Sequence, residues 1–411
     1  SEYINQNSKE KGWEEIRELF SVYSYVVFLL VAIKNITGKT DRAKEQAISL
    51  ELESKENLNL LFSYPGTESI AKDIAIIISN ETQIDINALY QEYLSVDYSL
   101  RNNLVEFSSG KNSRDTLGSY YTQEEFAYEI TKKAVEEYLA NYITNPNVIR
   151  IADFSCGGGA FLIAAHKVCK DYGVKVKLLG VDVDPIATMI ARSRLIEEHV
   201  ENNAIQIILG NPLLTMNEFE ESTKAFSAAL KGRYYNVDLA IDINEEYDIV
   251  IGNPPWEKIR FEEKKFLSHY MDTHLIATKK DRENAISTVL LTNQEFYVSM
   301  LEDYKHAKED IKKQEMFIDT RAGELNTYAL FTEYALKHIS EKGIGILLNE
   351  KITEDLNLHI KDKIKVNLLN NDFDCSISRL NNKIIGLQFK NITPDKMKVI
   401  MSIFIENMQP H

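Results

Sequence analysis

The chain has few of the residues that build disulfide frameworks or metal centres. Its three cysteines, Cys156, Cys169 and Cys375, are too few for a disulfide framework and match no zinc-site spacing. Eight histidines in 411 residues leave little from which to build a metal cluster. We therefore expect no bound metal and a reducing compartment.

Long apolar segments are also missing. The longest apolar run, residues 22–33, is too short to span a bilayer and contains Tyr and Ser, which predicts a core helix. No basic leader precedes a small-residue cleavage site. These features predict a cytoplasmic protein that does not enter a membrane.

The chain has fewer basic than acidic residues. Lys plus Arg number 47 against 62 Asp plus Glu, giving a formal net charge of −15. A protein that grips a phosphate backbone by itself usually carries a basic face. The charge balance therefore argues against tight binding of nucleic acid by this chain alone. The contents of hydrophobic residues (44%) and charged residues (27%) exclude a disordered or fibrous chain.

The chain divides into two parts by the periodicity of its apolar residues. From Trp13 to about Phe107 they recur at spacings of three and four, which predicts an all-helical N-terminal domain over residues 1–110. A polar, Gly/Ser-rich stretch over residues 108–113 marks the boundary.

Beyond the boundary, five short β-rich runs alternate with helical segments, which is typical of a parallel sheet with helices on both faces. The predicted strands are Val148–Asp153, Leu178–Asp182, Ile205–Leu209, Tyr247–Ile251 and Ile344–Leu348. Such sheets bind ligands at the carboxyl ends of their strands, where the strand order reverses. We assign residues 111–411 to this Rossmann-like α/β domain, with an insertion at about 258–320.

The first predicted strand ends at Asp153 and runs into Gly157-Gly158-Gly159. Glycines at this point let a ligand approach the backbone at the start of the next helix. The Gly-x-Gly-x-x-Gly spacing of dinucleotide sites is missing, because Leu162 stands three residues beyond Gly159. Asp153, just before the turn, can accept hydrogen bonds from a ligand ammonium group.

The next two strands also end in polar residues. Asp182 closes the second strand and can hold both hydroxyls of a ribose. Asp184 stands before Pro185 and is better explained as a helix N-cap. Asn211 follows the third strand and either meets an adenine edge or forms an Asn-Pro turn.

The fourth strand runs into Asn253-Pro254-Pro255-Trp256. The prolines fix the backbone and remove two N–H donors, leaving the Asn253 side-chain oxygen and the Pro254 carbonyl as rigid acceptors. Two acceptors can hold both hydrogens of a planar amino group out of plane, so that its lone pair localises and attacks an electrophile. The Trp256 ring is a stacking platform for a flat ring. Alone the tetrapeptide is also compatible with a simple turn, but its place after the other motifs favours a site.

In this order the motifs resemble those of the amino-group S-adenosylmethionine-dependent methyltransferases that act on adenine in DNA. Residues 153–161 look like their cofactor-binding motif I, residues 180–185 like motif II, and residues 253–256 like the catalytic motif IV. Residues 118–123 are similar to motif X, Gly-x-Tyr-Tyr-Thr-Pro, which precedes motif I only in the gamma order of type I and many type II systems. The resemblance extends to type IIG and phage-defence enzymes and covers about residues 117–350.

The resemblance implies a site-specific adenine-N6 methyltransferase of a restriction-modification or phage-defence system, with double-stranded DNA as substrate. It implies that the cofactor S-adenosylmethionine is bound by Tyr121, Thr122, Asp153, Cys156, Gly157, Gly159, Phe161, Asp182 and Asn211. It also implies that Asn253, Pro254, Pro255 and Trp256 hold the target base. The adenine must flip out, because N6 of a paired adenine is engaged and buried in the duplex.

The sequence departs from the family pattern at three points. Gln123 stands where motif X has Pro, and Asn211 replaces the commoner Asp. Only about sixty residues follow the last predicted strand, so we recognise no target-recognition domain. We therefore expect a companion specificity subunit, or a missing target-recognition segment, to grip the DNA. The chain alone should bind the cofactor but hold DNA weakly.

Two other functions stay open at this stage. Methyltransferases that modify a glutamine in translation release factors also carry Asn-Pro-Pro and act on a planar amide nitrogen. Motif X and the insertion at 258–320 are not typical of that group. A catalytically silent cofactor-binding subunit is the third possibility, and the intact tetrapeptide at 253–256 argues against it.

Overall fold

The computed structural model describes most of the chain. The described residues are 13–101, 104–109, 122–140, 146–216, 222–255, 257–268, 276–347, 363–368, 371–381 and 384–388.

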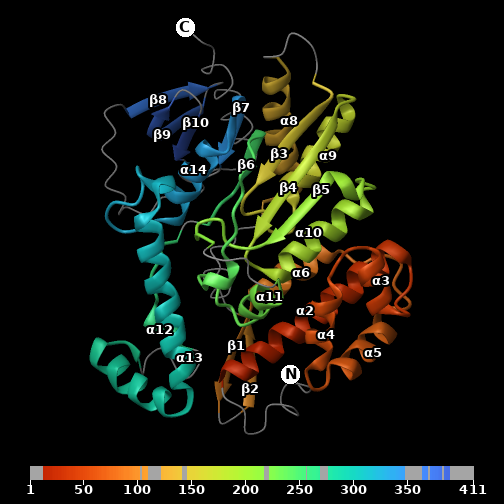
Figure 1. Ribbon diagram of the computed structural model, residues 1–411, viewed down its shortest axis with the longest axis vertical. Helices are drawn as coiled ribbons and strands as arrows, with labels where there is room; N and C mark the ends of the chain where they lie inside the picture. The colour runs from red at the N-terminus through yellow and green to blue at the C-terminus, as the bar shows by residue number, and fades with distance from the viewer. Residues whose placement is uncertain are drawn as a thin grey trace.

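A five-stranded parallel sheet forms the centre of the molecule (Figure 1). Its strands are β3 (Val148–Asp153), β4 (Lys175–Asp182), β5 (Ile205–Leu209), β6 (Tyr247–Gly252) and β7 (Ile339–Leu347). Their spatial order is β5-β4-β3-β6-β7, and every neighbouring pair is parallel. The order reverses between β3 and β6, so Asp153 and Gly252 end the two strands that flank the ligand-binding crevice of such a sheet. The predicted parallel sheet is confirmed.

Helices cover both faces of the sheet, as predicted. One face carries α8 (Glu124–Ala140), α9 (Ala160–Asp171) and α10 (Pro185–Glu197), and the other carries α14 (Thr327–Lys337) and the end of α13 (Lys279–Lys313). Successive strand residues point to opposite faces. Ile151 therefore joins the hydrophobic cluster under α8 and α9, whereas the next residue, Ala152, joins the cluster under α14.

The N-terminal part is built around one buried helix. The helices are α2 (Trp13–Thr37), α3 (Ala43–Ser49), α4 (Lys55–Ser63), α5 (Thr67–Ile78) and α6 (Ile86–Ser95). Within α2, the stretch Glu18–Thr37 is long and apolar enough to cross a membrane, yet 67% of its apolar window is buried inside the fold. A helix that is apolar on nearly all sides is expected where other helices surround it. The predicted core helix is therefore what the structure contains.

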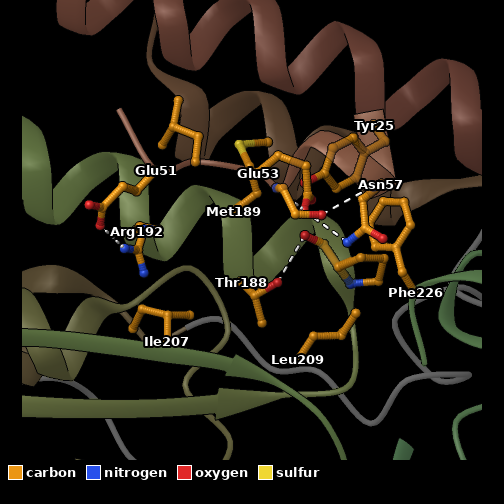
Figure 2. Close-up of a pocket in the computed structure, with 13 residues that line it drawn as sticks. Tyr25, Glu51, Glu53, Asn57, Thr188, Met189, Arg192, Ile207, Leu209 and Phe226 are labelled. Carbon is orange, nitrogen blue, oxygen red and sulfur yellow. Dashed lines mark hydrogen bonds and ion pairs between the residues drawn. The ribbon is translucent and has the colours of Figure 1, made fainter. Parts of the chain in front are cut away.

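The N-terminal helices share a core with the helices that cover the sheet. Ile186 and Ile190 of α10 belong to the same hydrophobic cluster as the buried residues of α2. Tyr25 of α2 packs edge-on against Phe226 of α11 (Ser222–Leu230), with ring centroids 5.2 Å apart (Figure 2). The two parts of the chain are therefore joined by continuous apolar packing.

The helical run ends earlier than predicted. After Ser95 the chain forms an antiparallel hairpin of β1 (Val96–Arg101) and β2 (Leu104–Ser109). The prediction of helix up to about Phe107 is wrong here. Residues 96–101 read Val-Asp-Tyr-Ser-Leu-Arg, an apolar–polar alternation with the period of two that a strand requires.

The remaining elements follow the sheet or interrupt it. The insertion at 258–320 contains α12 (Glu263–Ser268) and all of α13, a helix of 35 residues that runs well beyond the sheet (Figure 1). A separate antiparallel sheet, in the order β10-β9-β8, consists of β8 (Lys363–Leu368), β9 (Asn371–Asn381) and β10 (Ile384–Gln388).

Candidate active site

A pocket lies at the carboxyl ends of β3, β4 and β6. Seven of the predicted site residues line it together: Thr122, Asp153, Cys156, Gly157, Phe161, Asp182 and Asn253. Tyr121 and Trp256 lie outside the described residues, as do residues 118–120 of motif X. The strand ends thus bring together residues that are up to 131 positions apart in the sequence.

Asp153 is the most deeply buried acid of the pocket, with a relative exposure of 1%. Burial, together with the charge of Asp182, raises the pKa of its carboxyl to about 8, although a hydrogen bond from the Ser155 backbone N–H (3.0 Å) opposes the rise. Gly252 makes room for this carboxyl, because a Cβ there would lie 2.6 Å from Asp153 Oδ1. A buried carboxyl with a raised pKa is a favourable partner for a cationic ligand group.

Asp182 is held by two backbone N–H groups. Gly157 donates to its Oδ2 at 2.8 Å and Asp184 donates to its Oδ1 at 3.0 Å. Burial raises the pKa of Asp182 to about 6 in spite of these bonds. The carboxylate keeps further lone pairs, so it can still accept hydrogen bonds from a ligand.

Two glycines of the turn have different roles: Gly157 lines the pocket, and Gly159 packs against α10. Gly157 lines the pocket with a left-handed φ of 51°. Gly159 has a φ of 81°, and a Cβ there would lie 3.0 Å from the Ala191 Cβ, so this glycine permits close packing of α9 against α10. Cys156 lies in the sequence between Asp153 and these glycines. Burial raises the pKa of its thiol well above the ordinary value, so the thiol stays neutral in the pocket wall.

Two polar residues after the strands serve as structural caps. Asp184 accepts from the Ile186 N–H at 2.8 Å and is the N-cap of α10, as predicted. Asn211 accepts from the Leu213 N–H at 3.1 Å and donates to the Tyr234 carbonyl at 2.9 Å. Its side chain thus forms the Asn-Pro turn and is not in the pocket wall, so contact of Asn211 with an adenine stays a prediction.

The Asn-Pro-Pro loop carries an unused acceptor. Asn253 Oδ1 is buried and has no hydrogen-bond partner among the described residues, while its Nδ2 donates to Thr122 Oγ1 at 3.4 Å. An unsatisfied buried acceptor costs about 1–3 kcal/mol, so such atoms mark places where a ligand is expected.

A threonine from another element fixes the end of this loop. The Thr327 hydroxyl donates to the Pro255 carbonyl at 2.7 Å and accepts from the Glu257 N–H at 2.9 Å. Thr327 is 2% exposed and begins α14. One hydroxyl therefore orients the two peptide groups on either side of residue 256.

One wall of the pocket, which the sequence did not predict, comes from α6. Asn87, Tyr90, Gln91 and Leu94 line it and occupy one helix face, at the spacing i, i+3, i+4, i+7. The Tyr90 hydroxyl donates to Asp184 Oδ2 at 2.5 Å. The helical period of α6 was visible in the sequence, but no local signal indicates which element its polar face meets.

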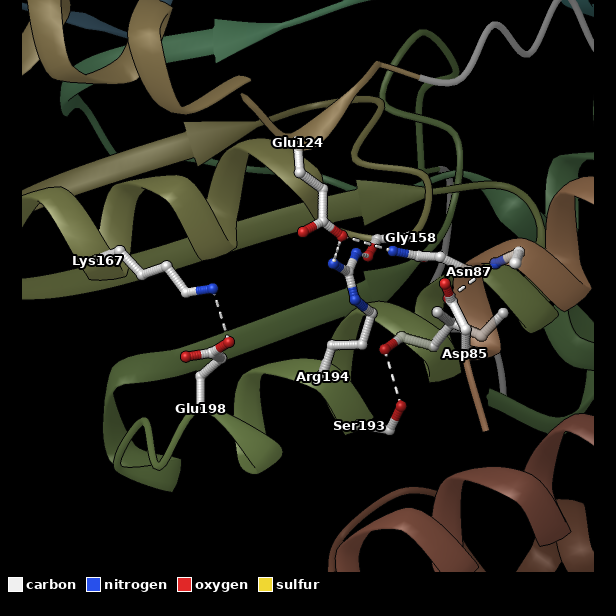
Figure 3. A network of polar contacts seen from close by, with 10 residues as sticks. Asp85, Asn87, Glu124, Gly158, Lys167, Ser193, Arg194 and Glu198 are labelled. Carbon is white, nitrogen blue, oxygen red and sulfur yellow. Dashed lines mark hydrogen bonds and ion pairs between the residues drawn. The ribbon is translucent and has the colours of Figure 1, made fainter. Parts of the chain in front are cut away.

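A polar network links this wall to the glycine turn (Figure 3). Glu124 at the start of α8 accepts from Asn87 Nδ2 at 2.9 Å and also from Arg194 Nη2. Arg194 Nη1 donates to the Gly158 carbonyl at 2.7 Å. Three helices, α6, α8 and α10, therefore hold the glycine turn in place.

The chain is similar to known DNA methyltransferases. Residues 107–292 match the family model of N-6 DNA methylase. A type II methyltransferase, M.BanIII of Aneurinibacillus aneurinilyticus, is 26% identical over 140 residues, which are 34% of this chain but only 22% of that protein.

Among solved structures, a type I restriction-modification methyltransferase subunit from Streptococcus thermophilus is 12% identical. It aligns over 84% of this chain and 70% of that one, with a TM-score of 0.32, a likeness too low to support any statement about activity. The sequence match to the family model spans the predicted motifs I, II and IV. The segment that matches the N-6 DNA methylase family model, residues 107–292, covers less than half of the chain.

Proposed function

We propose that the chain transfers a methyl group from S-adenosylmethionine to the N6 amino group of a flipped-out adenine in DNA. The observation that carries this proposal is the buried Oδ1 of Asn253, which has no partner among the residues that the structure describes and belongs to a residue of the same pocket as the buried acid Asp153. An acceptor that needs an N–H donor and an acid that suits a cation are the two features this reaction demands.

The residues of the pocket fit the cofactor. When bound, S-adenosylmethionine supplies an electrophilic methyl group on a sulfonium. Asp153 would accept hydrogen bonds from its ammonium group, and Asp182 would accept from its ribose hydroxyls. Burial raises the pKa of both acids because it disfavours their ionised forms. A cationic ligand would offset this penalty by stabilising the negative charge. The backbone at Gly157, free of a side chain, would let the ligand approach closely.

The Asn-Pro-Pro loop would orient the attacking nitrogen. Asn253 Oδ1 and the Pro254 carbonyl would each accept one N–H of the amino group, which directs the nitrogen lone pair away from the base plane. No general base is required before the attack, because the nitrogen loses its proton only after the new N–C bond has formed. The protein contributes position and electrostatics, as in other transfers between two bound reactants. Trp256 would stack on the flipped base.

Partners and setting follow from charge and from the family resemblance. With a net charge of −15, this chain should bind DNA weakly unless a basic partner supplies phosphate contacts. We therefore infer a companion specificity subunit, or a missing target-recognition segment, in a cytoplasmic restriction-modification or phage-defence system. The match of residues 107–292 to the N-6 DNA methylase family model supports the DNA substrate.

Tritiated S-adenosylmethionine tests the proposal. The chain is incubated with DNA, with a translation release factor, or with neither acceptor. We expect label in DNA alone. Label in the release factor alone would replace the DNA proposal with glutamine methylation. Binding of the cofactor with no transfer to either acceptor would indicate a catalytically silent subunit.

A further inference from the structure

An ion pair outside the active-site pocket connects two segments that the proposed reaction uses (Figure 3). The guanidinium of Arg194, on α10, pairs with the carboxylate of Glu124, at the start of α8. Neither residue lines the pocket. The Arg194 side chain is 12% exposed and the Glu124 side chain is 49% exposed, so one half of the pair is in contact with solvent. Because a partly exposed ion pair contributes little to stability by itself, its role lies in the backbone that its two members hold.

The arginine of this pair holds the glycine turn. Arg194 Nη1 donates to the Gly158 carbonyl at 2.7 Å. On either side of this carbonyl, the Gly157 N–H donates to Asp182 Oδ2 at 2.8 Å and the Gly159 N–H donates within the turn at 2.9 Å. Consecutive glycines have no side chains to restrict the backbone, so their conformation depends on such hydrogen bonds. The bond from Arg194 has a charged donor, which makes it stronger than a bond between two neutral groups.

The glutamate of this pair holds the segment that orients Asn253. Glu124 follows Thr122 by two residues, and the Thr122 hydroxyl accepts from Asn253 Nδ2 at 3.4 Å. Two residues of backbone span at most about 7 Å, so a fixed Glu124 keeps Thr122 within a small region. Asn87 of α6 also donates to the Glu124 carboxylate, at 2.9 Å. The position of Thr122 therefore depends on the donors that hold Glu124.

The guanidinium joins the two segments through one rigid group. Its Nη1 donates to Gly158 and its Nη2 to Glu124, and both nitrogens lie in one plane. A shift of either partner must therefore move the other or break one of the two bonds. We propose that Arg194 and Glu124 are positioning residues, which couple the glycine turn to the contact between Thr122 and Asn253. The consequence for catalysis rests on the proposed function, in which the turn holds the cofactor and Asn253 orients the target amino group.

Hydrogen exchange of the cofactor-free chain tests the coupling. Arg194→Met keeps an unbranched apolar stem but removes every donor. We expect backbone amides to exchange about tenfold faster both in the turn, over residues 156–160, and at the start of α8, over residues 124–130. Faster exchange in neither segment, or in one segment alone, would overturn the coupling.

Arg192 provides the matched control on the same helix. It pairs with Glu51 at 2.9 Å and its side chain is 19% exposed, so Arg192→Met removes a comparable ion pair from α10. We expect exchange in both segments to stay at the native rate in this variant. Equal acceleration by Arg192→Met and Arg194→Met would assign the effect to a general loosening of α10 and reject the proposal.

Titration calorimetry with S-adenosylmethionine tests the positioning role. The cofactor Kd should rise about tenfold or more in Arg194→Met and stay unchanged in Arg192→Met. Arg194→Lys keeps the charge but has no planar fork for two partners, so its Kd should be intermediate. Thermal unfolding confirms that the variants fold, and Arg194→Lys replaces Arg194→Met in every measurement if the latter does not.

The two measurements separate this proposal from the proposed function. Faster exchange in both segments with a native Kd would make the pair a structural link and reject its positioning role. A native chain that binds no cofactor would instead reject the proposed function, and the exchange measured without cofactor would still decide whether the pair couples the two segments.

Discussion

The side chain of Asn253 donates from Nδ2 to the Thr122 hydroxyl at 3.4 Å, which leaves its Oδ1 buried without a described partner. The Thr122 contact engages the Nδ2 end of the amide. Thr122 belongs to the segment before α8 and Asn253 to the end of β6, so the acceptor is oriented by an element far from it in the sequence. With Nδ2 engaged by Thr122, Oδ1 is the atom of this amide that is left to accept an N–H of the target amino group in the proposed reaction.

Affinity for the cofactor should depend on pH through Asp153. In the empty chain its pKa is about 8, so the carboxyl is mostly protonated below that pH. The cofactor ammonium group requires the ionised form. Binding of S-adenosylmethionine should therefore tighten from about pH 6 to about pH 8, by at most about tenfold per pH unit, and then level off. Titration calorimetry across this range measures it, and Asp153→Asn should bind weakly, with no further tightening above about pH 7, where Asp182 (pKa about 6) is already ionised. An unchanged pH dependence in Asp153→Asn would remove Asp153 from this role.

The raised pKa of Asp153 also makes the stability of the chain depend on pH. Stability should fall as the pH rises, whereas cofactor affinity should increase. Because the folded state holds a proton on Asp153 that the unfolded state has lost, the free energy of unfolding should fall as pH rises from about 4 to about 8. Chemical denaturation of the cofactor-free chain and of Asp153→Asn at several pH values measures this. Asp153→Asn should show the smaller loss, and equal losses would contradict the assignment.

Gly252→Ala should displace the Asp153 carboxyl while leaving residue 153 itself unchanged. A Cβ at 252 would lie 2.6 Å from Asp153 Oδ1, so the carboxyl must move. We expect cofactor affinity to fall about as far as in Asp153→Asn, as measured by calorimetry. The double variant should lose little more than either single one, since both changes act on one group. Additive losses would indicate two independent effects.

Thr327 should act as a positioning residue for the catalytic loop. Thr327→Val removes the hydroxyl bonded to Pro255 and Glu257, and we expect kcat to fall about tenfold or more with the cofactor Kd unchanged. Thr327→Ser keeps the hydroxyl and should restore most of the rate. A simple stability defect would instead lower the melting temperature of both variants and leave kcat of the folded fraction intact.

Tyr90 connects the N-terminal helices to the cofactor pocket. Tyr90→Phe deletes the donor to the buried Asp184 carboxylate and should cost about 1–3 kcal/mol in stability. Cofactor affinity should also fall, because the Asp184 N–H holds Asp182. Denaturant unfolding and calorimetry measure the two effects. Tyr93→Phe, a tyrosine of the same helix that is not in the pocket wall, is the matched control. Equal losses of cofactor affinity in both variants would show that Tyr90 has no special connection to the site.

The sheet and the strand ends were predictable because buried parallel strands are nearly continuous apolar runs. Residues 148–153 and 205–209 have the predicted strand bounds for this reason. The polar residues after such runs are conspicuous in the sequence, which is why Asp153, Asp182 and Asn253 were identified and are found in one pocket.

The wall from α6 was not predictable, since tertiary packing alone brings Asn87 and Tyr90 to the glycine turn. The hairpin of β1 and β2 was wrongly predicted as helix because it directly follows the helical pattern of α6, although the apolar period changes to two after Ser95. Asn211 shows why a polar residue at a strand end does not by itself predict a ligand contact. Its side-chain oxygen and nitrogen both form hydrogen bonds with neighbouring backbone.

The central claim is that Asn253 orients an adenine amino group for methyl transfer. The most direct measurement is mass spectrometry of nucleosides from adenine-containing DNA, incubated at low salt with the full chain and S-adenosylmethionine. N6-methyladenine should form with the native chain and fall about 10²-fold or more with Asn253→Ala, while cofactor affinity is retained. Undiminished N6-methyladenine with Asn253→Ala, or methylation of cytosine alone, would contradict the account.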